Sequence, residues 1–330
     1  MEQLPNELLE KIFDDIDETE KKPVREVCTK WYGMNPMEKM VIKYKNDDQE
    51  RIINDILKIK PKELVFSYCH DIPDRFSIKA IIDAVINQVD VYILTIEHCY
   101  FSNTEDEYIF EFDNLEYFIM NESYIPKVTI ECKCLDYLKI TNCGLKEINL
   151  DGCPSLNYII LHFNALKEFA YFSDELVHLD LSCNNLYQVE LNCNSIKHLT
   201  LDYNKYLQSF YMEGCSELLY LELRGCRHIT RTVDYNEYIH LKHLVVAETC
   251  ISELDISELT DLESLDIGFT QNLTEIDLSN NTKLTKLELY QSSLTALDLS
   301  NNKNLKELQA GNNPRLTIDT SHLKLASYNK

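Results

Sequence analysis

The chain has 330 residues, and a hydrophobic content of 45% argues against an intrinsically disordered protein. Its 55 acidic and 32 basic residues give a net charge of −23, which argues against a nucleic-acid-binding face and against adhesion to anionic membranes. We therefore predict no nucleic-acid or membrane partner, and the acidity favours a target protein with a basic patch.

The first predicted element is an amphipathic helix that opens in the stretch LPNELLEKIF, residues 4–13. Pro5 suits the first helical position. Apolar side chains follow on one broad stripe: Leu8, Leu9, Ile12, Phe13 and Ile16. A piece of roughly 35 residues buries little apolar surface alone. The stripe therefore predicts a partner, and the alternative is that these helices only cap the first coil of the array that follows.

Residues 1–34 resemble an F-box, whose usual form is Leu-Pro, a Glu-Leu-Leu helix with Ile-Phe, and a second helix ending in Val-Cys with Trp after two residues. Glu7 and Cys28 match this form. The resemblance implies docking on a Skp-type adaptor, and through it on a cullin, by Leu4, Pro5, Leu8, Leu9, Ile12, Phe13, Ile16, Val27 and Trp31. The segment Lys21-Lys22-Pro23 departs from the family, which has apolar contacts there, and this departure bears on the strength of adaptor binding.

Residues 35–124 are predicted to form leucine-rich repeats with outer helices. Apolar stretches centred on Met40, Leu64, Leu94 and Phe118 follow at steps of 24, 30 and 24 residues, which leave room for a helix in each coil. Two helices are indicated by apolar residues at helical spacing: Ile52, Ile53, Ile56 and Leu57 in the first gap, then Ile78, Ile81, Ile82, Val85 and Val89 behind a Ser77 cap.

Residues 125–330 carry a shorter repeat, leucine-x-x-leucine-x-leucine with Asn or Cys three positions later, as in LVHLDLSCN (176–184). With offset copies included, the central apolar residues run from Leu138 to Leu308 in sixteen steps of about 10.6 residues. Two copies make one coil of about 21 residues with a short strand on each side, a length typical of leucine-rich repeats. The predicted fold class is an α/β repeat solenoid: F-box helices, helix-containing coils and then compact two-stranded coils.

The residue that closes each copy is predicted to bond backbone groups left unpaired at the corner of the coil, so that these residues stack into a ladder. They are Asn164, Asn184, Asn194, Asn204, Asn281, Asn302 and Asn313, with Cys69, Cys99, Cys143, Cys153, Cys215 and Cys226 in the same register. The remaining close pair, Cys132 and Cys134, has no second ligand pair, so we predict no metal and no cofactor. Without a secretion signal, free thiols in the cytosol or nucleus are expected.

The residue just before the central position, taken on alternate copies, forms a column of aromatic and imidazole side chains. We predict that this column binds the target, because amphipathic rings favour protein contacts; the alternative is that tyrosine simply suits strands. Its members are Tyr117, Tyr137, Tyr158, His178, His198, Tyr220 and His243. The other set of copies presents carboxylates, which are a solvated surface or a face for a basic partner: Glu147, Glu168, Glu190, Glu253, Asp255, Glu275, Asp277 and Asp298.

Catalytic motifs are not persuasive, because the histidines are spread over the coils and have no paired nucleophile. The chain resembles the F-box/leucine-rich-repeat proteins, and this resemblance implies a non-catalytic substrate-recognition subunit of an SCF-type ubiquitin ligase. Two alternatives remain open. One is an F-box scaffold that promotes no ubiquitin transfer, and the other is a plain protein-binding repeat module.

Overall fold

The computed structural model describes residues 39–43, 49–69, 71, 77–101, 107–229 and 234–329. The F-box-like stretch, with all nine predicted adaptor-binding residues, lies outside these described residues, as does the predicted domain boundary at residue 34. No helix in the described ranges is long and apolar enough to cross a membrane.

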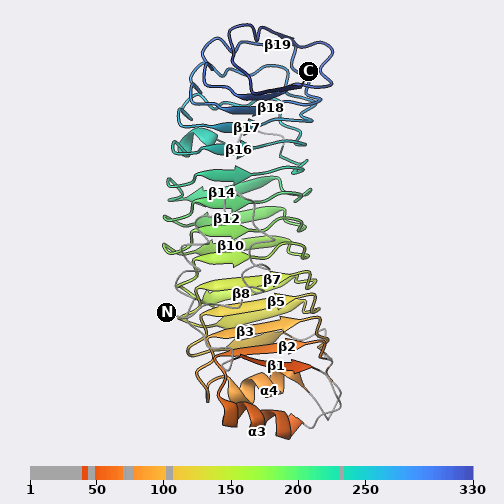
Figure 1. Ribbon diagram of the computed structural model, residues 1–330, viewed down its shortest axis with the longest axis vertical. Coiled ribbons are helices and arrows are strands. Elements are labelled where there is room, and N and C mark those ends of the chain that lie inside the picture. Colours follow the sequence, from red (N-terminus) through yellow and green to blue (C-terminus); the bar gives the residue numbers. More distant parts are fainter. Residues whose placement is uncertain are drawn as a thin grey trace.

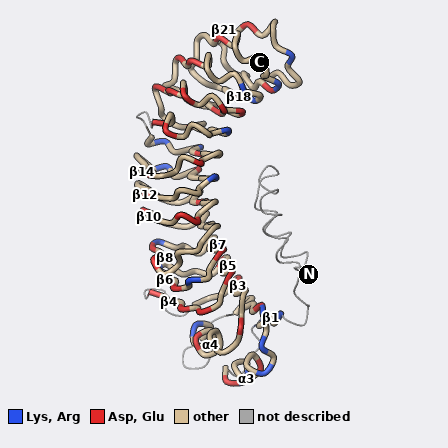
Figure 2. Tube along the Cα trace, turned by 90° about the vertical axis from the view of Figure 1, so that its left-hand side faces the viewer, with Lys and Arg blue, Asp and Glu red and all other residues tan. Residues whose placement is uncertain are grey.

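The described chain is a leucine-rich-repeat solenoid whose coils stack into one elongated array (Figure 1). Each coil gives one strand to a parallel sheet of 14 strands, which lies on the inner side of the gently curved array (Figure 2). We call the solvent side of this sheet the concave face. The strands are β1 (Lys39–Lys43), β2 (Glu63–Ser67), β3 (Ile93–Glu97), β5 (Tyr117–Asn121), β7 (Tyr137–Thr141), β9 (Tyr158–Ile160), β11 (His178–Asp180), β13 (His198–Thr200), β15 (Tyr220–Glu222), β16 (His243–Val245), β17 (Ser264–Asp266), β18 (Lys286–Glu288), β20 (Glu307–Gln309) and β22 (Ser327–Asn329).

The register of this sheet confirms the predicted repeat. Met40 pairs with Leu64, and the pairing continues through Leu94 and Phe118 to Leu138. The same column then runs through Ile159, Leu179, Leu199, Leu221, Leu244, Leu265, Leu287 and Leu308. From Leu64 onward every member of the column is fully buried. Because side chains alternate along a strand, the residues on either side of this column belong to the concave face.

The outer side of the first two long coils is helical, as predicted. It holds α3 (Gln49–Ile59) and α4 (Ile78–Val85), and the Ser77 hydroxyl caps α4 by accepting the Ala80 N–H. In the third long coil the outer segment is a strand. Outer strands form three smaller parallel sheets: β4 (Tyr108–Glu111), β6 (Lys127–Glu131) and β8 (Glu147–Gly152); β10 (Glu168–Phe172), β12 (Gln188–Asn192) and β14 (Ser209–Glu213); and β19 (Ala296–Leu297) with β21 (Thr317–Ile318). A single 3₁₀ turn, η2 (Tyr235–Glu237), completes the described elements.

The outer segments around Leu254 and Ile276 form no strand, so the prediction of two strands per coil is wrong there. The carboxylate of Asp255 accepts the backbone N–H of Ser257 at 3.1 Å, and Asp277 accepts that of Ser279 at 2.8 Å. The same turn follows β19 and β21, where Asp298 and Asp319 accept the backbone N–H groups of Ser300 and Ser321, so it limits the outer strand to the residues up to the central one and does not by itself exclude a strand. The repeat continues through these coils, but its outer segment turns immediately after the central apolar residue.

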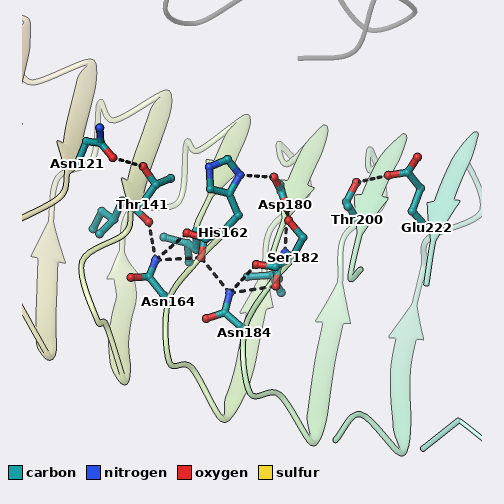
Figure 3. Close-up of polar contacts among 12 residues, drawn as sticks. Asn121, Thr141, His162, Asn164, Asp180, Ser182, Asn184, Thr200 and Glu222 are labelled. Carbon is teal, nitrogen blue, oxygen red and sulfur yellow. Dashed lines mark hydrogen bonds and ion pairs between the residues drawn. The ribbon is translucent and has the colours of Figure 1, made fainter. Parts of the chain in front are cut away.

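The predicted ladder is confirmed for six of the seven asparagines and for all six cysteines, which the structure divides between the two edges of the coils. Asn184 donates to the Leu161 and Leu181 carbonyls at 2.9 and 3.0 Å, and so ties neighbouring coils together (Figure 3). Asn194 is the exception, because its side chain is exposed and bonds Asp174. The ladder position in that coil belongs to Cys193, whose thiol donates to the Tyr171 carbonyl at 3.6 Å.

Cys132 is also a ladder residue, since its thiol donates to the Leu115 carbonyl at 3.1 Å, whereas Cys134 is exposed. All cysteines in the described ranges are free thiols. Burial raises the pKa of the Cys153 thiol to about 12 and that of Cys193 to about 11. These thiols are therefore protonated hydrogen-bond donors with little nucleophilic character.

Candidate protein-interaction surface

The predicted aromatic column exists and runs along the concave face. Its seven residues pair in register from β5 to β16, and successive ring centroids lie 4.2–6.2 Å apart. The tightest part is at its C-terminal end, where the His198 and Tyr220 rings stack at 4.2 Å and the Tyr220 and His243 rings at 4.3 Å. The next members are Ser264, Lys286 and Glu307, as the repeat predicts.

Most of this column is buried. Tyr117, Tyr137, Tyr158 and His198 are each 6–9% exposed, although the sequence led us to expect rings open to a partner. Stacked rings hide one another's faces, and burial also lowers the pKa of His243. The column therefore contributes to the packing of the sheet, and its role in target binding stays a prediction.

A row of polar contacts lies beside the column on the concave face (Figure 3). Thr141 donates to Asn121 at 2.8 Å, His162 Nδ1 lies 2.8 Å from Asp180, and Thr200 donates to Glu222 at 3.1 Å. Burial raises the pKa of the Asp180 carboxyl, but its bonds with His162 and Ser182 outweigh burial, and the pKa lies below its ordinary value.

The pKa of the Asp202 carboxyl is raised, in contrast to that of Asp180. Asp202 lies just beyond β13, half-buried, and accepts the backbone N–H of Arg224 at 2.6 Å. Burial first, and then the negative charge of Glu222, raise the pKa of its carboxyl to about 7. Asp180 adds to this repulsion, and Arg224 opposes it only in part. Asp202 is thus a carboxyl group for which the fold supplies too little positive charge.

We expect Asp202→Asn to stabilise the protein at pH 8 by about 2 kcal/mol, a value that discounts the full shift for solvent screening. The pKa of this group is about 7 in the folded protein against an ordinary 3.8, so the folded state retains a proton that the unfolded state releases. The contribution of Asp202 to stability is therefore lost as pH rises from about 4 to about 7. At pH 3 the substitution should have little effect. Urea unfolding of both proteins across this range measures the difference.

Asp277→Asn is the matched control for that measurement. Asp277 is exposed, and the bond from the Ser279 N–H lowers the pKa of its carboxyl. Its substitution should not stabilise the protein at pH 8. An Asp202→Asn variant that is less stable than wild type at pH 8 would contradict the expected repulsion among these carboxylates.

Arg224 is the main cation of this region, and its side chain is engaged. It donates to Asp266 and lies 3.7 Å from Glu248. Burial lowers the pKa of its guanidinium, but the Asp266 carboxylate outweighs burial and the pKa is raised. Asp266 also accepts the Gly268 N–H at 2.8 Å. Arg224 therefore ties β15 to β17 and leaves Asp202 poorly compensated.

The residue after the concave-face segment of each coil adopts a left-handed backbone conformation, with φ between 49° and 71°. This position directly precedes the ladder residue, and it recurs in twelve coils as Tyr68, His98, Glu122, Asn142, Phe163, Cys183, Tyr203, Gly225, Glu248, Phe269, Gln291 and Asn312. Glycine and asparagine adopt such a conformation at least cost. The chain nevertheless places an aromatic or imidazole ring there in five coils.

Four of these aromatic side chains are exposed to solvent: Tyr68 (58%), Phe163 (55%), Tyr203 (49%) and Phe269 (38%). We call these four residues the aromatic rim. The rim residues are not among the predicted site residues, although an aromatic residue directly before the ladder Asn, Cys or Thr is a visible signal in the sequence. Its meaning depends on the backbone angle, which the repeat pattern alone does not supply.

The predicted acidic residues of the other set of copies lie on the outer side, and all are exposed except Glu190, which is half-buried. Some have polar partners there, since Lys127 lies 3.0 Å from Glu147 and Tyr187 donates to Glu168 at 2.9 Å. Acidic residues occur in coils along the whole array (Figure 2). Within the described ranges no three or more His, Cys, Asp or Glu side chains gather as a metal site would require.

No protein-family model matches this chain, and no curated protein matches it either. Solved structures with similar architecture include the functional domain of InlJ from Listeria monocytogenes, which includes a cysteine ladder. It is 23% identical, with a TM-score of 0.42, over 60% of this chain and 50% of that one. The structure of the Drosophila Toll–Spätzle complex is 14% identical, with a TM-score of 0.40, over 84% of this chain and 48% of that one. The plant peptide hormone receptor RGFR1 in complex with RGF2 is 15% identical, with a TM-score of 0.37, over 88% of this chain and 62% of that one.

This chain thus spans about half to three-fifths of the length of those structures. The assignment as a leucine-rich-repeat solenoid rests on the strand register of this chain and on its two ladders.

Proposed function

We propose that this protein is a non-catalytic leucine-rich-repeat module that binds another protein along the aromatic rim and the adjoining concave face. The observation that carries the proposal is the rim itself. A left-handed backbone costs a residue with a side chain roughly 1–2 kcal/mol, and an aromatic ring in water forgoes its burial energy. Four coils bear both costs at one repeat position, and exposed aromatic rings are the side chains that most often anchor protein interfaces.

Two observations favour binding over catalysis. In the described chain, His162 is held by Asp180 and His98 lies 3.0 Å from Glu122, so these imidazoles have carboxylate partners rather than nucleophiles. The carboxyl group with the most strongly raised pKa, Asp202, lies among other carboxylates. Neither arrangement resembles an acid–base pair aimed at a substrate.

A more specific function follows if the first 34 residues are considered together with the solenoid. Their F-box resemblance supports a substrate-recognition subunit of an SCF-type ubiquitin ligase that works in the cytosol or nucleus. Leu8, Leu9 and Trp31 would contact the Skp-type adaptor, and the solenoid would hold the target. The support for this proposal is the sequence motif alone, and a protein-binding module without ubiquitin transfer remains its alternative.

Proximity labelling in cells tests both the protein-binding proposal and the SCF proposal. We expect a full-length variant with all four rim residues changed to Asn to lose target labelling at least tenfold and to keep adaptor labelling. The fold should persist, because Asn142 and Asn312 already occupy this position in other coils. A Leu8, Leu9 and Trp31 to Ala variant should lose adaptor and cullin and keep the target.

The matched control changes Phe172 and Tyr211 to Asn, since both are aromatic and about 60% exposed on the outer sheet. If this control loses the same partners as the rim variant, or if the rim variant loses none, the rim is not the binding surface. Adaptor labelling that survives the Leu8, Leu9 and Trp31 substitutions would contradict the SCF proposal and leave the binding module intact.

A further inference from the structure

The concave face is buried to different depths along the array. On β2, β3, β5, β7 and β9, both side chains that flank the central buried column are 1–9% exposed. We call these side chains the N-terminal concave face. At the same repeat position of the same sheet, Val65 on β2 is 4% exposed, whereas Val245 on β16 is half-buried.

Neighbouring side chains do not explain the deep burial of Val65. It lies between a valine and a threonine on the adjoining strands, whereas Val245 lies between two longer side chains, Glu222 and Asp266. Such burial on the solvent side of a sheet requires a further layer above it. No described element supplies this layer, since the helices lie at the N-terminal end of the array and the outer strands lie on the opposite side of the coils (Figures 1 and 2).

The missing layer has to be apolar and about 19 Å long. The N-terminal concave face crosses five strands, which are spaced about 4.8 Å apart. Beside the first three rings of the aromatic column it presents aliphatic side chains: Val65, Ile93, Ile119 and Ile160. The undescribed ranges within the array hold five residues or fewer each, too few to cover this distance with a packed surface. The stretch that precedes β1 has 38 residues.

That stretch contains a surface of matching length and character. The amphipathic helix that the sequence predicts over residues 4–16 would be about 20 Å long. Its apolar stripe consists of Leu8, Leu9, Ile12, Phe13 and Ile16, and helical spacing places the carboxylates of Glu7, Glu10 and Asp14 on the opposite side. Residues 17–38 lead from this helix to β1, which adjoins β2. When extended, they span up to about 70 Å, so the helix can reach the whole face.

We propose that the apolar stripe of residues 4–16 packs on the N-terminal concave face and covers it. The stripe and the aliphatic side chains of the sheet then leave water together, which is the main favourable term in such docking. The carboxylates on the opposite side of the helix stay in water. The aromatic rim and the half-buried side chains of β15 and β16 remain open to a target. This intramolecular contact goes beyond the proposed function and does not depend on it.

Acetylation of lysines on the full-length protein tests the proposal, because Lys139 belongs to the N-terminal concave face and is 8% exposed. N-hydroxysuccinimide acetate reacts with accessible amines, and mass spectrometry gives the rate at each lysine. We expect a variant with Leu8→Ser, Leu9→Ser and Ile12→Ser to acetylate Lys139 at least fivefold faster than wild type. The side chain of Lys286, on β18 of the same sheet, is 45% exposed, and its rate should change less than twofold.

The matched control is a variant with Glu7→Ser, Glu10→Ser and Asp14→Ser, which places three serines on the opposite side of the same predicted helix. It should acetylate Lys139 at the wild-type rate. An unchanged rate at Lys139 in the stripe variant would overturn the proposal. An equal rise at Lys139 and Lys286 would also overturn it, because the stretch would then support the whole array. An equal rise in the control variant would show that the apolar stripe is not the cover.

The F-box resemblance assigns the same apolar side chains to the Skp-type adaptor, so the two contacts exclude each other. In a co-purified complex with the adaptor, Lys139 should therefore react as fast as in the stripe variant. A complex in which Lys139 stays protected would contradict the inference. Failure of the adaptor to bind would instead contradict the SCF proposal and would leave the acetylation result standing.

Discussion

Asn204→Ala should lower the free energy of unfolding by about 3–5 kcal/mol, whereas Asn194→Ala should lower it by less than about 0.5 kcal/mol. Asn204 is fully buried. Its amide donates to the Leu181 and Leu201 carbonyls at 2.9 Å each, and its oxygen accepts the Leu186 N–H at 3.1 Å. Alanine would leave the buried Leu186 N–H without its acceptor and would remove one of two donors from each carbonyl, since Asn184 also donates to Leu181 and Cys226 to Leu201. Asn194, by contrast, is exposed, and water replaces its bond to Asp174.

Urea unfolding followed by circular dichroism measures both variants. The pair is a matched control, because the same substitution is made at two asparagines that the sequence places in one register. Asn204→Asp adds a second test, since the Leu186 N–H keeps its acceptor while each of the two carbonyls loses one of its two donors. Similar losses for Asn194→Ala and Asn204→Ala would show that the ladder bonds contribute little to stability.

The sequence predicted the repeat register and most of the ladder because both follow from spacing. The central apolar residues recur at a fixed step, and every described member of the column from Met40 to Leu308 pairs with the next. Asn194 was assigned wrongly because Cys193 and Asn194 are adjacent. A shift of one residue decides which side chain enters the coil. The structure places the thiol inside and the amide outside.

The candidate surface was less predictable for a different reason. Alternation along a strand places Tyr137 and Tyr158 on the concave face correctly, but it does not report whether that face is accessible, and both rings are buried. The aromatic rim depends on a left-handed backbone at one corner of each coil. Nothing in the residue types reveals that angle, because the position holds tyrosine, phenylalanine, glutamate, glutamine, asparagine, cysteine, histidine and glycine in different coils.

The concave face also changes character along the array. Strands β2 and β7 are buried at every residue, whereas β15, β16 and β18 are fully buried only at their central leucine. The more accessible part carries Glu222, Asp266 and Glu288 beside Arg224 and Lys286.

Phe118→Ala should lower the free energy of unfolding by about 3–5 kcal/mol and should loosen mainly the N-terminal coils. Phe118 is fully buried on β5, and its ring packs edge-on against Phe110 at 5.3 Å and Phe112 at 5.5 Å. These rings fill the coil in which a strand takes the place of the outer helix. Leu138 and Ile159 hold the same register in the next coils, so Phe118→Leu should cost less, about 1–2 kcal/mol.

Hydrogen exchange tests where the Phe118→Ala variant loosens. In a solenoid each coil contacts only its neighbours, so a cavity at β5 weakens the junction between the helix-containing coils and the compact coils. Amides of β2 and β3 should then exchange faster than in wild type, while those of β13 to β18 keep their protection. Phe172→Ala removes an equal ring from the exposed outer side, where 61% of it meets solvent, and should leave both groups unchanged. Equally faster amide exchange in all coils would mean that the solenoid unfolds as one cooperative unit. The coil that contains Phe118 would then not be a separate junction.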